Sequence, residues 1–275
     1  MKKIGIVFCV LFCFISVVKA EEKPTFERLL PLLTKEKNEE EKIFKTTQEL
    51  GEAFKNSNKE LPRIFIKKLP SDFAQKGSKE LYSKILTALF LKENEKILNE
   101  RILFMLLKEK ADKGQPWNQQ EQAYFDYLVD RYDAIVLKTV PTKINYLLIK
   151  IDEIPPSLAV AQSALRTDFG KKNMDSPFEQ MGWKDTQTYA PIQYENLTDA
   201  VKEYMKEMNA TPNYDDWRRL RAKYANKKIT NPSYYMASGL RTYQPEDPAY
   251  FEKIQKLMNQ NLFIFSMDDL NLKKN

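Results

Sequence analysis

The 275-residue chain contains no histidine, and this absence excludes several kinds of chemistry. A Ser-His-Asp triad, a Cys-His pair and an imidazole-based zinc site all require that side chain. Both cysteines, Cys9 and Cys13, lie near the start, so the rest of the chain offers no thiol for a disulfide, a nucleophile or a metal. The seven glycines form no phosphate-binding motif. We therefore expect no metal and no cofactor, and acid–base chemistry would depend on carboxylates, lysine or tyrosine.

Residues 1–20 have the pattern of a signal peptide. Two lysines precede an apolar run from Ile4 to Val18, and Val18-Lys19-Ala20 suits a cleavage site. The run is short for a membrane span, although an uncleaved N-terminal anchor stays open as the alternative. We expect export across an inner membrane and location in the periplasm or cell envelope.

The charge of the chain gives little support to a nucleic-acid partner. Removal of Lys2, Lys3 and Lys19 with the signal peptide lowers the formal net charge from +6 to +3. This excess is small and dispersed, so we expect no nucleic-acid binding. It could assist contact with an anionic cell wall or membrane surface.

Hydrophobic periodicity predicts a mainly helical protein. The strongest pattern runs from Ser78 to Lys110, as one helix or as two with Asn94 as the second cap, and its charged residues are expected to form an exposed face. A charged segment precedes it, with two weaker helical patterns over 24–33 and 43–54. Further helices are expected to begin near Asn118, Pro141, Asn196, Tyr214, Pro232 and Asp247.

The stretch from Glu153 to Gly170 predicts a buried helix at the centre of the fold. Pro155 and Pro156 suit a first turn, because the N–H groups that they lack would be unpaired there. Gly170 suits a left-handed end. Close packing is expected of the small and apolar residues between them, Leu158, Ala161, Ala164 and Leu165.

This central stretch resembles the catalytic helix of the Bax-like branch of the bacterial endo-β-N-acetylglucosaminidases, which are lysozyme-like peptidoglycan hydrolases. The family run P-x-S-L-x-L-A-Q-A-A-N-E-S-G-W-G is matched at Pro156, Ser157, Leu158, Ala161, Gln162, Ala164 and Gly170. Other motifs follow in the family's order: Phe178–Met181 resembles F-G-Q-W, Asn196–Met205 resembles S-L-x-D-S-V-x-x-Y-M, and Tyr243–Tyr250 resembles Y-A-T-D-P-x-Y with one residue inserted. The resemblance covers about Pro62 to Phe263.

The resemblance implies a mainly α fold, with a lysozyme-like α-lobe, a small, reduced β-hairpin lobe and N-terminal helices before them. It divides the chain into the signal peptide 1–20, a charged helical segment 21–61, a helical region 62–139 that packs on the core, and a glucosaminidase-like domain 140–275. The hairpin lobe is expected between 171 and 195.

The family's catalytic glutamate aligns with Arg166, and this departure decides the predicted activity. Glycosidases need a protonated carboxylic acid beside the glycosidic oxygen, and a guanidinium cannot release a proton at working pH. Its charge would also oppose the positive charge of the transition state, by roughly 3 kcal/mol for two unit charges about 6 Å apart at an effective dielectric constant of about 20. The sequence therefore predicts a family member with impaired or lost hydrolysis.

The resemblance also implies which residues meet the ligand. Tyr243 corresponds to a tyrosine that lines the family's active site, although a core tyrosine bonded to backbone is the equal alternative. Glu179 is the candidate for a displaced second carboxylate. Contacts with glycan are expected from Gln162, Phe178, Gln180 and Tyr189.

We therefore expect a non-catalytic binder of peptidoglycan or another GlcNAc-containing glycan. Two alternatives stay open: an active glucosaminidase that uses a displaced carboxylate such as Glu179, and a helical scaffold that binds another envelope protein through residues 21–61. The sequence does not decide the oligomeric state.

Overall fold

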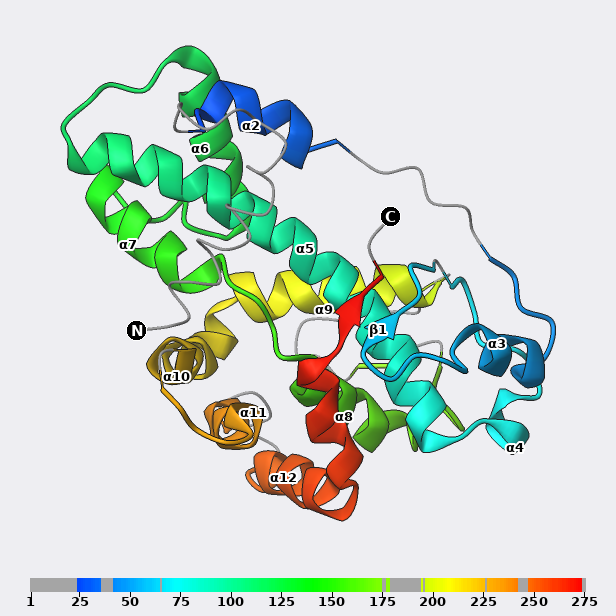
Figure 1. Ribbon diagram of the computed structural model, residues 1–275. Helices are drawn as coiled ribbons and strands as arrows, with labels where there is room; N and C mark the ends of the chain where they lie inside the picture. The colour runs from blue at the N-terminus through cyan, green and yellow to red at the C-terminus, as the bar shows by residue number, and fades with distance from the viewer. Residues whose placement is uncertain are drawn as a thin grey trace, which may run out of the picture.

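The computed structural model describes residues 24–35, 42–64, 66–174, 177–178, 194, 196–225, 227–241 and 247–273. This part of the chain is mainly helical with a small β element, which confirms the predicted fold class (Figure 1). The α-helices are α2 Phe26–Leu33, α3 Thr47–Ala53, α4 Phe73–Lys76, α5 Lys79–Asp112, α6 Gln119–Arg131, α7 Val140–Lys150, α8 Pro156–Thr167, α9 Leu197–Ala210, α10 Asp215–Ala225, α11 Pro232–Met236 and α12 Tyr250–Gln260. The remaining elements are the 3₁₀ helices η1 Pro212–Tyr214, η2 Ala237–Leu240 and η3 Leu262–Asp269, and the strands β1 Glu60–Leu61 and β2 Asn271–Leu272.

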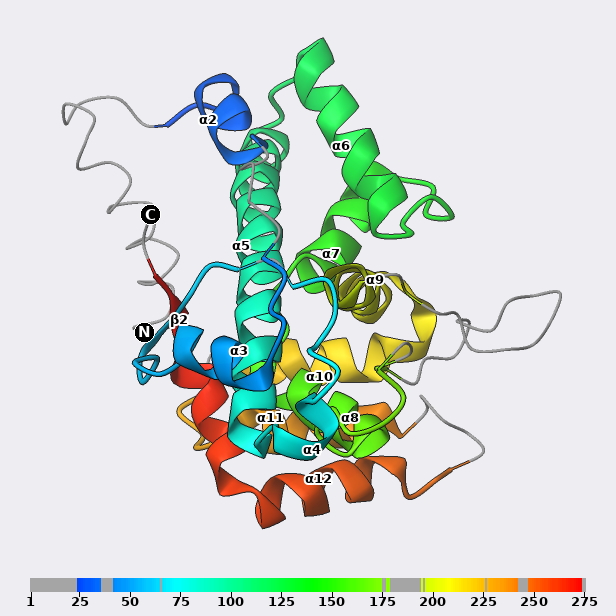
Figure 2. The same ribbon diagram turned by 90° about the vertical axis from the view of Figure 1, so that its right-hand side faces the viewer.

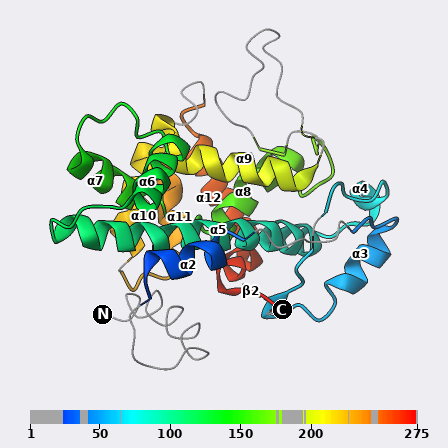
Figure 3. The same ribbon diagram turned by 90° about the horizontal axis from the view of Figure 1, so that it is seen from above.

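Helix α5 runs through the molecule, and helices from both halves of the chain pack along it (Figures 1 and 3). It is continuous over 34 residues, so the alternative of two helices is wrong. Ser78 begins the helix by accepting a hydrogen bond from the Leu81 N–H at 3.0 Å. Asn94 is buried in mid-helix, where Nδ2 donates to the Ile154 carbonyl at 2.8 Å and Oδ1 accepts from the Ile154 N–H at 3.0 Å. These two bonds tie α5 to the segment before α8.

Two of the charged residues on α5, Glu93 and Arg101, do not belong to the exposed face that the sequence suggested. Glu93 is buried and pairs with Lys96 at 2.7 Å. Arg101 donates to the carbonyls of Leu148, at 3.0 Å, and of Ile151. Because these carbonyls belong to the end of α7, the arginine binds α5 to α7 and satisfies acceptors that the helix leaves open.

Helix α8 is the buried centre of the lower part of the molecule, in contact with α5, α11, α12 and η3 (Figures 1 and 2). It begins at Pro156 with Pro155 at the N-cap, as predicted. The Asp268 carboxylate in η3 accepts hydrogen bonds from the Ser157 N–H at 2.8 Å and from its hydroxyl at 2.6 Å. An acid from the C-terminal segment thus caps the helix, and this partner was not predicted.

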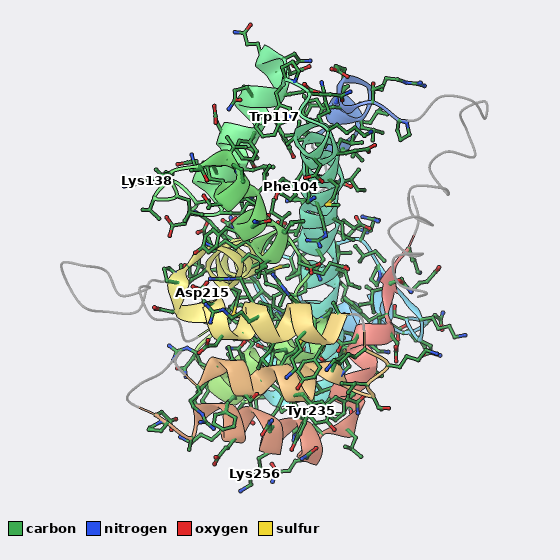
Figure 4. The ribbon with its side chains drawn as sticks, turned by 90° about the vertical axis from the view of Figure 1, so that its left-hand side faces the viewer. Phe104, Trp117, Lys138, Asp215, Tyr235 and Lys256 are labelled. Carbon is green, nitrogen blue, oxygen red and sulfur yellow. The ribbon has the colours of Figure 1, made fainter. Side chains whose placement is uncertain are left out.

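Helices α2, α6 and α7 lie around the C-terminal half of α5 (Figure 1). Asn118 caps α6 as predicted, in a reciprocal capping box with Glu121. Trp117, marked in Figure 4 at the start of α6, donates from Nε1 to the Leu107 carbonyl at 2.9 Å and packs 4.5 Å from the Phe125 ring. Apolar packing therefore fixes α6 against the last turns of α5.

The predicted regions 62–139 and 140–275 share one hydrophobic core, because α5 contacts α8, α9 and η3. The β element within the described ranges is a parallel pair, with Glu60 opposite Asn271 and Leu61 opposite Leu272. It pairs the segment between α3 and α4 with the C-terminal end of the described chain. Residues 179–193, on which most of the predicted hairpin falls, and the predicted signal peptide lie outside the described residues. None of the helices that the structure describes has both the length and the apolar character to cross a membrane.

Candidate functional site

The C-terminal end of α8 is a tight turn with three successive left-handed residues. The helix ends at Thr167, and Asp168, Phe169 and Gly170 have φ values of 49°, 56° and 85°. The predicted left-handed conformation of Gly170 is confirmed. A Cβ atom on Gly170 would lie 2.7 Å from the ring of buried Tyr82, so the turn packs directly on α5.

Arg166 lies on the last turn of α8, partly exposed. Its carbonyl accepts a hydrogen bond from Asn173 Nδ2 at 3.2 Å, which closes the turn after the helix. Asp168 is the sole acidic residue in the sequence from Arg166 to Met174, and its exposed carboxylate lies 3.5 Å from Lys171 Nζ. This stretch of chain therefore holds basic groups, and its one carboxylate has a lysine partner.

Gln162 and Phe178 are interior residues, and this corrects the prediction that they contact glycan directly. Gln162 is 3% exposed: Tyr204 donates to its Oε1 at 2.6 Å, and its Nε2 donates to the Tyr250 hydroxyl at 3.2 Å. Phe178 is 2% exposed and stacks on Tyr204 with ring centroids 4.4 Å apart. The two residues instead hold α8, α9 and α12 together. The other predicted site residues, Glu179, Gln180, Tyr189 and Tyr243, lie outside the described residues.

A cleft of about 300 Å³ adjoins the turn after α8. Its walls are the segment from Lys67 to Ala74, the turn from Gly170 to Met174, and the start of α9 with Tyr194. A hydrogen bond from the Leu197 N–H to the Lys67 carbonyl at 2.8 Å fixes two of these walls together. Figure 2 shows α4 and the end of α8 on this side of the molecule.

The cleft is basic. Lys67, Lys68, Lys171 and Lys172 line it, all four are exposed, and none of the described residues in the lining is acidic. Lys171 pairs with Asp168, whereas the other three lysines form no ion pair with any described carboxylate. This site was not predicted from the sequence, because its two lysine pairs lie about a hundred residues apart in the chain.

Glu207 is a second feature that the sequence analysis missed. It is 6% exposed, and both of its carboxyl oxygens lack a hydrogen-bond partner among the described residues. Burial, with a contribution from the Glu203 charge, raises the pKa of Glu207 to about 8. Burial also raises the pKa of Tyr194, and the charges of Glu203 and Glu207 add to this, so Glu207 lies close to a residue of the cleft. The raised pKa favours the protonated form of Glu207 at neutral pH.

The arginines of α10 have a structural role. Arg218 donates to the Met208 carbonyl at 2.7 Å, and Arg221 donates to Asn209 Oδ1 at 2.7 Å and to the Ile149 carbonyl at 2.7 Å. They satisfy open acceptors near the ends of α7 and α9 and do not form an anion site.

Within the described ranges, no group of three or more acidic side chains is placed to hold a metal ion. Comparison of the chain with models of protein families, with curated proteins and with solved structures finds no match.

Proposed function

We propose that this chain is an exported cell-envelope protein that binds GlcNAc-containing cell-wall glycan without hydrolysing it. The observation that carries the proposal is the cleft beside the C-terminal turn of α8, the helix whose sequence resembles the catalytic helix of the glucosaminidases. The family assignment itself is part of the proposal.

The dimensions and lining of the cleft suit a sugar. About 300 Å³ is at the lower end of the range for small-molecule sites and accommodates one or two pyranose rings. Tyr194 and Leu69, both partly exposed, offer apolar surface, and Ser71, Asn173 and Asn196 offer polar groups around it. A sugar ring presents the same combination of an apolar face and a polar edge.

The chemistry of the turn favours binding over cleavage. Arg166 supplies neither a proton nor a negative charge to an oxocarbenium-like transition state. Glu207 does carry a proton, but both of its oxygens are enclosed, so it cannot reach a glycosidic oxygen from its observed position. A hydrolase that uses a displaced carboxylate is therefore the less favoured function.

The test combines sedimentation with insoluble peptidoglycan and an assay for newly released reducing ends. We expect the wild-type protein to sediment with peptidoglycan and to release no reducing ends. Substitution of two cleft residues, Tyr194→Ala with Asn173→Ala, should lower the bound fraction, whereas Tyr127→Ala, an exposed tyrosine on α6, should not. Release of reducing ends by the wild type would refute the non-hydrolytic role, and failure to sediment would favour an envelope scaffold.

A further inference from the structure

We infer that the cleft is an anion-binding subsite, and that it recognises a carboxylate or phosphate group carried by the glycan. The inference rests on the proposed function for the polymer, but it depends on the charge of the cleft and not on the resemblance to glucosaminidases.

The first argument is the composition of the lining. Four lysines come from two walls: Lys67 and Lys68 precede α4, and Lys171 and Lys172 follow α8. Main-chain bonds from the N–H groups of Lys171 and Lys172 to the Thr167 carbonyl, at 2.9 and 3.0 Å, fix the second pair on its wall. Since none of the described residues in the lining is acidic and Asp168 offsets one lysine, these residues leave about three positive charges for a ligand.

The second argument is the orientation of α9. Asn196 and Leu197, the N-cap and first residue of this 14-residue helix, line the cleft. The N-terminus of a helix carries partial positive charge, so it adds to the field of the lysines. Asp199 in the first turn reduces this effect in part, and it is held by the Asn196 amide at 2.6 Å.

The third argument concerns the ligand. Lysine binds carboxylate and phosphate as a flexible point charge, and several lysines around one cleft favour a group with negative oxygens over a neutral sugar. In cell-wall material such groups have two sources: the carboxylates of the peptide-substituted glycan, and phosphodiester polymers attached to it. A neutral GlcNAc polymer has neither.

The experiment measures binding of the full exported protein to solubilised peptidoglycan fragments, to the same fragments with their carboxylates converted to amides, to a glycerol-phosphate polymer, and to neutral GlcNAc hexamer. The variant Lys67→Glu/Lys172→Glu changes one exposed lysine on each wall. The matched control, Lys228→Glu/Lys256→Glu, makes the same change in charge at two exposed lysines outside the cleft. Lys256 lies on α12 and is labelled in Figure 4.

We expect the cleft variant to lose at least tenfold in affinity for native fragments, the control variant to lose less than twofold, and wild-type binding to weaken tenfold or more between 50 and 500 mM salt. Loss of binding on amidation identifies carboxylate as the source, whereas tighter binding of glycerol-phosphate polymer identifies phosphate. Equal binding of native and amidated fragments by both variants, with no effect of salt, would overturn the anion subsite and leave the proposed function intact. Lysine-dependent binding of an anionic polymer without binding of any peptidoglycan fragment would support the subsite and refute the proposed function.

Discussion

Substitution of Glu207 by glutamine should remove most of the pH dependence of stability between pH 5 and 8. Glu207 is 6% exposed, and burial raises its pKa from 4.5 to about 8. The folded state therefore keeps a proton that the unfolded state has already released. Over this window the free energy of unfolding falls as the pH rises, and the contribution is fully present only below pH 4.5.

The size of the effect follows from the shift. Each pH unit in the window changes the free energy of unfolding by roughly 1.4 kcal/mol, so the wild type should lose up to about 4 kcal/mol between pH 5 and 8 relative to Glu207→Gln. The absence of histidine makes the measurement unusually direct, because no imidazole titrates in this range. Lys150, whose pKa burial lowers to about 8, adds an opposite slope only above pH 8.

The assay is urea unfolding followed by circular dichroism at pH 5, 6, 7, 8 and 9. Glu252→Gln, at an exposed position on α12, is the matched control and should parallel the wild type. Glu203→Gln should move the end of the decline to lower pH, because its charge helps to raise the pKa of Glu207. Parallel curves for the wild type and Glu207→Gln would refute the claim that Glu207 is protonated in the folded protein.

Three further substitutions test the interior by urea unfolding. Asn94→Ala should lower the free energy of unfolding by about 2–4 kcal/mol, because the buried N–H and carbonyl of Ile154 both lose their partner; a change below 1 kcal/mol would contradict that bonding. Gly170→Ala should lower the free energy of unfolding by about 2–4 kcal/mol, because Gly170 has a φ of 85° and its added Cβ would clash with the Tyr82 ring. Gly114→Ala, also at positive φ but in open space, should lower it by about 1–2 kcal/mol. Lys150→Met should lower the free energy of unfolding by about 3 kcal/mol, because the Tyr132 and Ala210 carbonyls lose a buried donor. The control Lys228→Met, at an exposed position, should leave it unchanged. Equal stability of these two variants would refute the role of Lys150.

The elements that could be predicted from the sequence are those whose signals are local. Asn118 and Asn196 lie three residues before an acid, and each caps its helix as expected, because the bonding partners lie within one turn. The apolar stripe of α9 is buried for the same reason, since helical periodicity alone brings Val201, Tyr204 and Met208 to one side.

The features that were missed depend on partners far apart in the chain. Asp268 caps α8 from 111 residues away. Strands β1 and β2 also lie far apart in the sequence, and each has two residues, which are too few to show an alternating pattern. Arg101 resembles a solvated charge in the sequence, but it binds carbonyls at the end of α7. The burial of a charged residue on a helix can therefore be predicted only when its tertiary partner is known.

The lysine cleft also bears on whether a carboxylate placed at position 166 would act as a general acid. A general acid must keep its proton at working pH, and nearby positive charges stabilise the ionised form and lower the pKa of a carboxyl. Asn173, which lines the cleft, is bonded to the Arg166 carbonyl, so position 166 adjoins the lysine-bearing turn. Lys171 and Lys172 on this turn would thus favour a carboxylate over a carboxylic acid in Arg166→Glu, and we expect this variant to release no reducing ends from peptidoglycan. The positive charges that suit an anionic ligand oppose the proton donor that glycoside cleavage requires, so the basic cleft is consistent with the proposed binding role.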